Sequence, residues 1–303
     1  ARRLPQLIAF GVALPRRGRF FQELSAHLRE LVRLNVAALR EAKAPEESSH
    51  AALLELYAFG NAAVTLDGRP LTSADWDSSV AKELFFLLSA HPEGLRKDEI
   101  IECLWRDVPP GKANSTFHST VYRVRRALWP GVVVREGQVY RLNVDIPHTS
   151  DVHEFERLWS EAQAQPERME ACYRRAIELY KGEYMADAYS DWCLERRDQL
   201  KDQFVAMLTD LSTYYAQHGR YEESAELAKR ALSLDAYREA LYRQIMQCYA
   251  QAGNRSAALR YYQACAQTLQ VELGIEPELE TVTLYNQILL DHAESLGCEV
   301  RQE

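Results

Sequence analysis

The sequence predicts a mixed α+β domain followed by an all-α domain of repeated helix pairs. Between residues 51 and 146, short segments of alternating apolar and polar residues stand before and after three helical patterns. From Thr149 to about residue 292 no strand signal appears and the pattern is helical. Within that second region, a set of tyrosine, glycine and small residues recurs at a spacing of 34, as stacked helix pairs require.

The composition is that of a globular protein. Of the 303 residues, 47% are hydrophobic and 26% are charged, which are ordinary proportions for a folded chain. No apolar run approaches the ~20 residues that a membrane span requires, and residues 1–14 lack the order of a secretory signal peptide. We therefore expect a cytoplasmic protein that makes no contact with a membrane.

The net charge of −8 hides an uneven distribution along the chain. Residues 1–52 carry +4, residues 53–145 carry −1 and residues 146–303 carry −11. Within the middle block, residues 112–142 hold six Lys or Arg residues against Glu136 alone, a local charge of +5. This basic stretch favours contact with nucleic acid, whereas the acidic region repels it and must serve another purpose.

The two ends of the chain fall outside these domains. Residues 1–43 carry apolar side chains at three- and four-residue spacing, and the polar stretch APEESS follows at residues 44–49. We interpret residues 1–50 as a helical segment and linker that end an upstream region, and residues 293–303 as a tail.

The elements of the α+β domain are predicted from turn signals as well as periodicity. The β-forming segments LLELYAF and AVTLDGRPLT open it, and Asp67-Gly68 marks a tight turn between short strands. Three helices are then expected, at residues 79–90, 97–105 and 113–128. The run VVVREGQVYRLN alternates on either side of Glu136-Gly137, which predicts a closing hairpin.

The all-α domain contains an internal repeat. Five residues recur 34 positions later; they are Tyr215, Gly219, Ser224, Ala228 and Ala231, matched by Tyr249, Gly253, Ala258, Tyr262 and Cys265. This is the period of tetratricopeptide repeats, in which small residues let two helices pack closely and Gly ends the first helix. An earlier helix pair, at residues 152–163 and 167–180, is similar to a further unit. Such repeats present a surface to partners.

The helix expected at residues 113–128 has two opposite faces. At 100° per residue, four apolar side chains fall within about 60° of one another and predict a buried stripe. They are Phe117, Val121, Val124 and Leu128. The opposite face carries Ser115, Ser119, Tyr122, Arg123 and Arg126. Arg125 lies at the flank of the stripe, so we expect it to bond to phosphate or to protein rather than to bases.

This outer face has the chemistry of DNA recognition. Guanidinium groups pair with guanine or phosphate, and hydroxyl groups suit phosphates and base edges. A basic hairpin directly after such a helix is typical of a winged helix, whose helix enters the major groove while the hairpin meets the adjacent backbone.

Specific motifs add a family resemblance. The stretch KANSTFHSTVYRVRRALWP and the following hairpin resemble the recognition helix and wing of OmpR-type winged-helix domains. Residues 53–290 resemble the Streptomyces antibiotic regulatory protein family, in which this domain precedes a tetratricopeptide-like bacterial transcriptional activation domain. Four motifs carry the resemblance: YRVRRAL at Tyr122–Leu128, YKGEYMAD at Tyr180–Asp187, AGNRSAALRYYQAC at Ala252–Cys265 and ELGIEPELETVTLYNQI at Glu272–Ile288.

The resemblance implies a transcription activator that binds direct repeats in promoter DNA. It also implies a homodimer on double-stranded DNA, with two protomers side by side, and a contact with RNA polymerase. The fold is then an α+β winged helix-turn-helix at residues 51–146 followed by an all-α tetratricopeptide-like activation domain at residues 147–292. The DNA-binding residues expected on this chain are Lys112, Ser115, Ser119, Tyr122, Arg123, Arg126 and Arg135.

One alternative function stays open at this point. The basic face is also compatible with a solvated helix whose arginines pair with neighbouring acids. In that case the chain is a protein–protein interaction scaffold whose winged helix does not bind DNA. The charge of −11 on the repeat region favours this reading, because that region repels DNA.

Other kinds of site receive little support. His148, Asp151 and His153 have a spacing that a metal site could use, but they lie where a helix begins, and Ser150 or Asp151 with Glu154 suits a helix cap. The aromatic residues Tyr184, Tyr189 and Trp192 are more typical of packing than of a ligand groove. The six cysteines lack metal-ligand spacing, and no catalytic motif is present. We expect no metal, no cofactor and no enzymatic activity.

Overall fold

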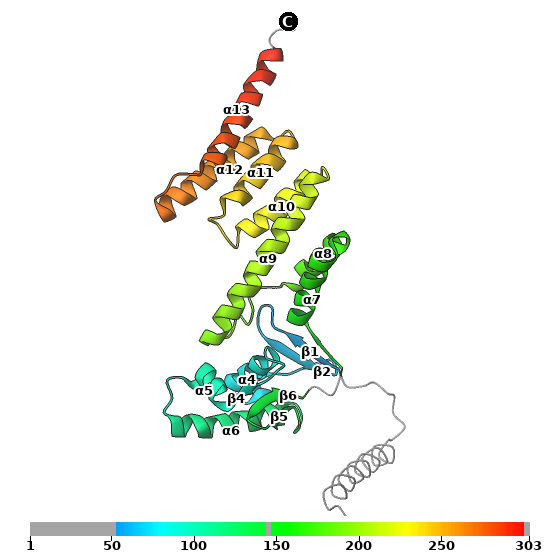
Figure 1. The fold of residues 1–303 in the computed structure, drawn as a ribbon, viewed down its shortest axis with the longest axis vertical. Coiled ribbons are helices and arrows are strands. Elements are labelled where there is room, and N and C mark those ends of the chain that lie inside the picture. The colour runs from blue at the N-terminus through cyan, green and yellow to red at the C-terminus, as the bar shows by residue number, and fades with distance from the viewer. Residues whose placement is uncertain (1–52, 144–146, 300–303) are drawn as a thin grey trace, which may run out of the picture. The chain divides into compact units, whose positions relative to one another are not determined.

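The computed structural model describes residues 53–143 and 147–299, with side chains described up to residue 290. These residues belong to one compact unit. A small β-containing region comes first and a mostly helical region follows (Figure 1). The helical segment expected at residues 1–50 lies outside the described residues. Within them, no helix is both long enough and apolar enough to cross a bilayer.

A four-stranded sheet opens the described chain. Strands β1 (Leu54–Tyr57), β2 (Ala63–Leu66) and β3 (Arg69–Pro70) are antiparallel neighbours. The expected tight turn lies between β2 and β3, where Asp67 and Gly68 have φ values of 53° and 74°, as a two-residue hairpin turn requires. Strand β7 (His148–Ser150) pairs with β1 in parallel. The expectation of no strand beyond Thr149 was therefore wrong, because three residues show no alternation and their pairing depends on a distant strand.

Three helices and a hairpin follow the first sheet. The helices are α4 (Ser79–Ser89), α5 (Lys97–Trp105) and α6 (Pro110–Ala127), and the hairpin is β5 (Val133–Glu136) and β6 (Val139–Leu142). These elements confirm the predicted order. Two short elements were not predicted, the single turn α3 (Ser73–Trp76) and the strand β4 (Leu95–Arg96), which pairs with β6. Both are too short to show a period.

The helical region begins directly after β7. Its helices are α7 (Asp151–Ala164), α8 (Met169–Leu179), α9 (Asp191–Gln217), α10 (Tyr221–Leu232), α11 (Glu239–Gln251), α12 (Arg255–Thr268) and α13 (Leu279–Glu299). A 3₁₀ turn, Pro166–Arg168, precedes α8, and a π-helical turn, Leu269–Leu273, follows α12. Because α13 runs to Glu299, residues 293–299 of the expected tail are helical.

The 34-residue spacing corresponds to two equivalent helix hairpins, α9–α10 and α11–α12. Gly219 and Gly253 follow the first helix of each hairpin with φ values of 75° and 78°, a conformation that favours glycine. The next residue of each closes the turn in the same way. The Arg220 amide donates to the Tyr215 carbonyl at 2.9 Å, and the Asn254 amide donates to the Tyr249 carbonyl at 2.8 Å.

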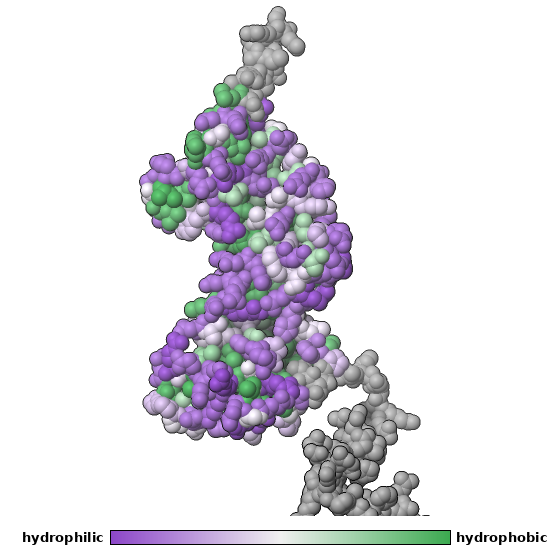
Figure 2. All heavy atoms as spheres, viewed as in Figure 1, coloured by the Kyte–Doolittle hydropathy of each residue, from purple (hydrophilic) through white to green (hydrophobic). Residues whose placement is uncertain are grey.

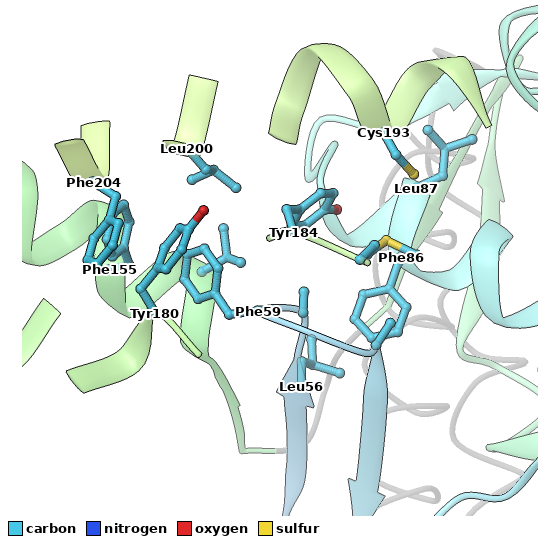
Figure 3. Close-up of a cluster of buried hydrophobic side chains, with 14 of the residues drawn as sticks. Leu56, Phe59, Phe86, Leu87, Phe155, Tyr180, Tyr184, Cys193, Leu200 and Phe204 are labelled. Atoms are coloured by element: carbon cyan, nitrogen blue, oxygen red, sulfur yellow. The ribbon is translucent and has the colours of Figure 1, made fainter. Parts of the chain in front are cut away.

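A continuous core joins the β-containing region to the first helices after it. Figure 3 shows Phe59, which follows β1, beside Phe155 of α7, Tyr180 and Phe204 of α9. The rings of Tyr180 and Phe204 are stacked, with centroids 3.9 Å apart, and Phe59 meets Phe155 edge-on at 5.1 Å. Buried aromatic rings contribute strongly to packing, so this cluster holds the two regions against each other.

Asp151 reinforces the same junction. Its carboxylate accepts hydrogen bonds from the backbone amides of Ala58 and Phe59 at 2.9 and 3.0 Å. Burial raises the pKa of this carboxyl group, and the amide donors partly oppose the rise. The neighbouring Ser150 caps α7 by accepting from the His153 amide at 3.3 Å. The cap predicted at this boundary is confirmed, and Asp151 in addition ties α7 to the first sheet.

Candidate nucleic-acid interface

Helix α6 presents the predicted DNA-binding side chains except Arg135, which lies in the hairpin. It begins three residues earlier than predicted, because Pro110 occupies the first helical position, where the fixed φ of proline suits a helix and its missing N–H costs nothing. Phe117, Val121 and Val124 are buried as expected, whereas Leu128 is half-buried at the residue that ends the helix. The Phe117 ring packs edge-on against Tyr140 of the hairpin at 4.9 Å. This contact fixes the helix against β6.

The predicted recognition residues share the outer face of α6. Lys112, Ser115, Ser119, Tyr122 and Arg126 are exposed, and Arg123 is half-buried. Tyr122 is 64% exposed, so its ring and its hydroxyl group are accessible from solvent. The Ser119 hydroxyl donates to the Thr116 carbonyl at 2.8 Å, so its lone pairs rather than its proton face outward.

The electrostatics of this face favour an anion at the start of α6. The first turn of the helix contains no acidic residue, so the partial positive charge of its free N–H groups is not neutralised locally. Lys112 adds a full charge in the same turn. Within the described chain, Lys112 forms no ion pair with an Asp or Glu side chain. The cation is therefore available to phosphate.

Arg123 and Arg126 pair with an acid, as the solvated-helix alternative expected, although the sequence did not identify which acid. The Asp77 carboxylate lies 2.9 Å from Arg126 Nη2 and 3.4 Å from Arg123 Nε. Asp77 directly follows the short helix α3, which packs against α6. Asp77 is more than 40 residues away from both arginines in the sequence, so no sequence pattern links it to them.

Arg135 lies in the hairpin, as predicted, and is exposed. Its guanidinium donates to the Gly137 carbonyl at 2.9 Å and to Gln138 Oε1 at 3.1 Å. The nearby Arg141 is paired with Glu136 across the same hairpin. Arg135 therefore stays close to the hairpin turn, where a wing would meet the DNA backbone.

Arg125 points away from the outer face. Its Nε and Nη2 donate to the Val133 carbonyl at 3.2 and 2.8 Å. We expected Arg125 to bond to phosphate or to protein rather than to bases, and its contact with the Val133 carbonyl is a bond to protein. This side chain joins the end of α6 to the first strand of the hairpin.

Two further polar residues near α6 were not predicted. Lys97, the first residue of α5, has its Nζ 3.2 Å from His118 Nε2 on α6. His118 is exposed and lies beside the predicted face. The Lys97 ammonium group and the His118 ring carry N–H groups that can donate further hydrogen bonds to an anion. Only the packing of α5 against α6 brings the two residues together.

The residues considered for other sites have structural roles or remain at the surface. The carboxylate of Asp151 is occupied by backbone amides, and the described residues contain no group of three side chains arranged for a metal ion. Tyr184 is buried, whereas Tyr189 and Trp192 border a groove between α5 and α9. The five cysteines whose side chains are described are free thiols, and burial raises the pKa of each.

Comparisons with known proteins identify the class of protein to which this architecture belongs. A family model described as the bacterial transcriptional activator domain matches residues 150–289. The transcriptional regulatory protein MoaR1 of Mycobacterium tuberculosis is 26% identical over 218 residues, which cover 68% of this chain and 70% of MoaR1. The regulatory protein AfsR of Streptomyces coelicolor is 25% identical over 196 residues, which cover 63% of this chain but 20% of AfsR.

A solved structure shares the fold. Mycobacterium tuberculosis EmbR, solved in complex with a low-affinity phosphopeptide, matches with a TM-score of 0.63 and 22% identity. The match covers 79% of this chain and 66% of the EmbR chain, so a third of that protein has no counterpart here. It supports the coarse architecture of a small N-terminal β-containing region followed by a mostly helical domain.

Together these matches define a transcriptional regulator and not an enzyme. More narrowly, the domain match and these relatives support a transcriptional activator of the Streptomyces antibiotic regulatory protein type. The resemblance inferred from the sequence motifs is confirmed at this level.

Proposed function

We propose that this chain is a sequence-specific, double-stranded DNA-binding transcription activator that acts in the cytoplasm. In this proposal residues 51–146 are an OmpR-type winged helix and residues 147–292 are a tetratricopeptide-like activation domain. The observation that carries it is the exposed basic face of α6, which the basic hairpin of β5 and β6 follows directly. Such a helix enters the major groove while the hairpin reaches the neighbouring backbone.

Each residue of the interface has a role in this proposal. Arg123 and Arg126 contact base edges, because a guanidinium pairs bidentately with guanine. Lys112 and Arg135 contact phosphate at the two sides of the groove, which sets position rather than sequence. Ser115, Ser119 and Tyr122 complete the face with hydroxyl groups. The helix of 18 residues is about 27 Å long at 1.5 Å per residue, which is ample for several base pairs.

The first test is binding of duplex DNA at increasing salt. We expect the chain to bind a duplex selected from a random library, with an affinity that falls linearly with salt on logarithmic axes because bound counterions are released. For the two phosphate contacts of Lys112 and Arg135 the slope should be about −2 per protomer. Fluorescence anisotropy with a labelled duplex measures it. Absence of binding at every salt concentration, together with recovery of protein partners from nuclease-treated lysate, would favour the scaffold alternative instead.

The helical domain has an exposed apolar surface suited to a protein partner. We define the apolar patch as Val271, Leu273, Ile275 and Leu279, which are 71%, 50%, 49% and 80% exposed. Figure 2 shows a hydrophobic patch at the place where Figure 1 draws the end of α12. Four acidic residues alternate with them, at Glu272, Glu276, Glu278 and Glu280. An exposed apolar group with a charged rim is typical of an interaction site.

The patch is held in a defined shape. The buried Glu239 carboxylate accepts from the Glu278 amide at 2.9 Å and from the Thr281 hydroxyl at 2.6 Å. Gly274, with a φ of 68°, ends the π-helical turn that carries Val271 and Leu273. We propose that RNA polymerase contacts this patch through a basic and apolar surface.

We also propose that two protomers bind side by side on direct repeats of the DNA, as a homodimer.

Replacing Val271 and Leu279 by serine tests the patch. We expect activated transcription in vitro, with a bacterial RNA polymerase and a selected promoter duplex, to fall about tenfold, since most interface residues contribute less than about 1 kcal/mol each and about 1.4 kcal/mol corresponds to a tenfold change. Binding to the duplex should not change. The matched control is Leu290→Ser, which removes another exposed leucine (66%) from α13. Equal activation by the double variant and the control would contradict the role of the patch.

A further inference from the structure

Asp77 has a fixed position beside the outer face of α6. It ends α3 in the left-handed backbone region, with a φ of 57°, and its amide donates to the Ser73 carbonyl at 3.0 Å. The preceding Trp76 is 2% exposed and packs against Phe85. Because the backbone is anchored and the side chain is short, the carboxylate has little freedom to move.

The Asp77 carboxylate contacts only one nitrogen of each arginine side chain. It contacts Arg126 through Nη2 and Arg123 through Nε, both with the same oxygen, Oδ2. A guanidinium carries five N–H groups, and a bidentate contact with guanine uses two of them. Both Nη groups of Arg123, and the Nε and Nη1 groups of Arg126, remain available. Asp77 and a base can therefore bind the same arginine at once.

We propose that Asp77 is a positioning residue that makes α6 discriminate between DNA sequences. This inference rests on the proposed function, since it concerns how the same face selects its duplex. Asp77 holds the guanidinium groups of Arg123 and Arg126 in place before DNA arrives, and it lowers the attraction of the helix for phosphate. The first effect strengthens binding to the correct sequence, and the second weakens binding to all others.

Two physical terms support this role. A free arginine side chain loses rotamer entropy when it binds, and a side chain that is already held loses less of it. One negative charge beside two positive charges also reduces the counterion-dependent attraction that all DNA sequences share. Both ion pairs are half-exposed, and such pairs contribute little to folding. Removal of the carboxylate should therefore affect recognition much more than stability.

The variant Asp77→Asn separates these effects. Asparagine tolerates the left-handed conformation, so we expect the thermal unfolding midpoint to stay nearly the same. We expect affinity for a random-sequence duplex to rise and affinity for the selected duplex to fall, so that their ratio drops about tenfold, as loss of one or two pre-organised side chains predicts. The matched control is Glu93→Gln, an exposed acid of the same region, for which the ratio should stay constant.

Repeating Asp77→Asn in an Arg126→Ala background completes the test. Because Asp77 acts through the arginines, its effect on the ratio should be smaller there than in the unsubstituted chain. An unchanged ratio for Asp77→Asn, or an equal loss in both backgrounds, would overturn the positioning role while leaving the proposed function in place. If the unsubstituted chain binds no duplex, the proposed function fails first and this role fails with it.

Discussion

Replacing Arg123 and Arg126 together by alanine is expected to remove sequence-specific duplex binding. Each arginine, if it contacts guanine in bidentate fashion, contributes about 1 to 3 kcal/mol to binding and to discrimination. Because both share Asp77, the two losses should not simply add. Titration of a selected duplex and a random duplex at one salt concentration measures both quantities. We expect the two duplexes to bind the variant almost equally.

Loss of charge alone has to be separated from loss of recognition. The double variant Arg174→Ala and Arg175→Ala removes the same charge from two exposed positions on α8, and it should keep its preference for the selected duplex. Both double variants replace side chains that are not fully buried, so each should fold with nearly unchanged stability. A selected duplex that binds the α6 variant as tightly as the unsubstituted chain would remove this helix from the proposed interface.

The largest loss of stability is expected for Phe155→Ala. Phe155 is fully buried and its ring lies among those of Phe59, Tyr180 and Phe204 (Figure 3). Truncation of a buried phenylalanine removes apolar contact and leaves a cavity, which lowers the free energy of unfolding by about 3 to 5 kcal/mol. Urea unfolding followed by circular dichroism measures the change.

The control for this variant is Tyr189→Ala, since Tyr189 is 91% exposed and its loss should change stability by no more than about 0.5 kcal/mol. Because Phe155 joins the first sheet to the helical region, its removal should also weaken their cooperativity. We expect the unsubstituted chain to unfold in one transition, and we expect the transition of the variant to broaden or split in two. A loss below about 1 kcal/mol would show that the aromatic cluster does not couple the two regions.

Residues that follow a regular period could be located from the sequence. Phe117, Val121 and Val124 repeat at helical spacing, so their burial and the exposure of Tyr122 and Arg126 followed from one helix wheel. The repeat from Tyr215 to Cys265 followed in the same way, because equivalent turns require glycine at equivalent places. The start of α6 was predicted three residues too late, since the fixed φ of Pro110 suits the first position of a helix and α6 extends back to it.

What the sequence determined by itself was local: the type and order of the longer elements, the basic face of α6, the repeated helix pairs and the family motifs. Tertiary structure alone decided the contacts between distant segments. It paired β7 with β1, directed Asp151 to the amides of Ala58 and Phe59, joined Lys97 to His118 and placed Asp77 between Arg123 and Arg126. The spacing of apolar residues predicts which side of a helix or strand is buried. It does not predict which distant residue lies opposite a polar side chain. The candidate interface was therefore visible in the sequence, and the acid beside its two arginines was not.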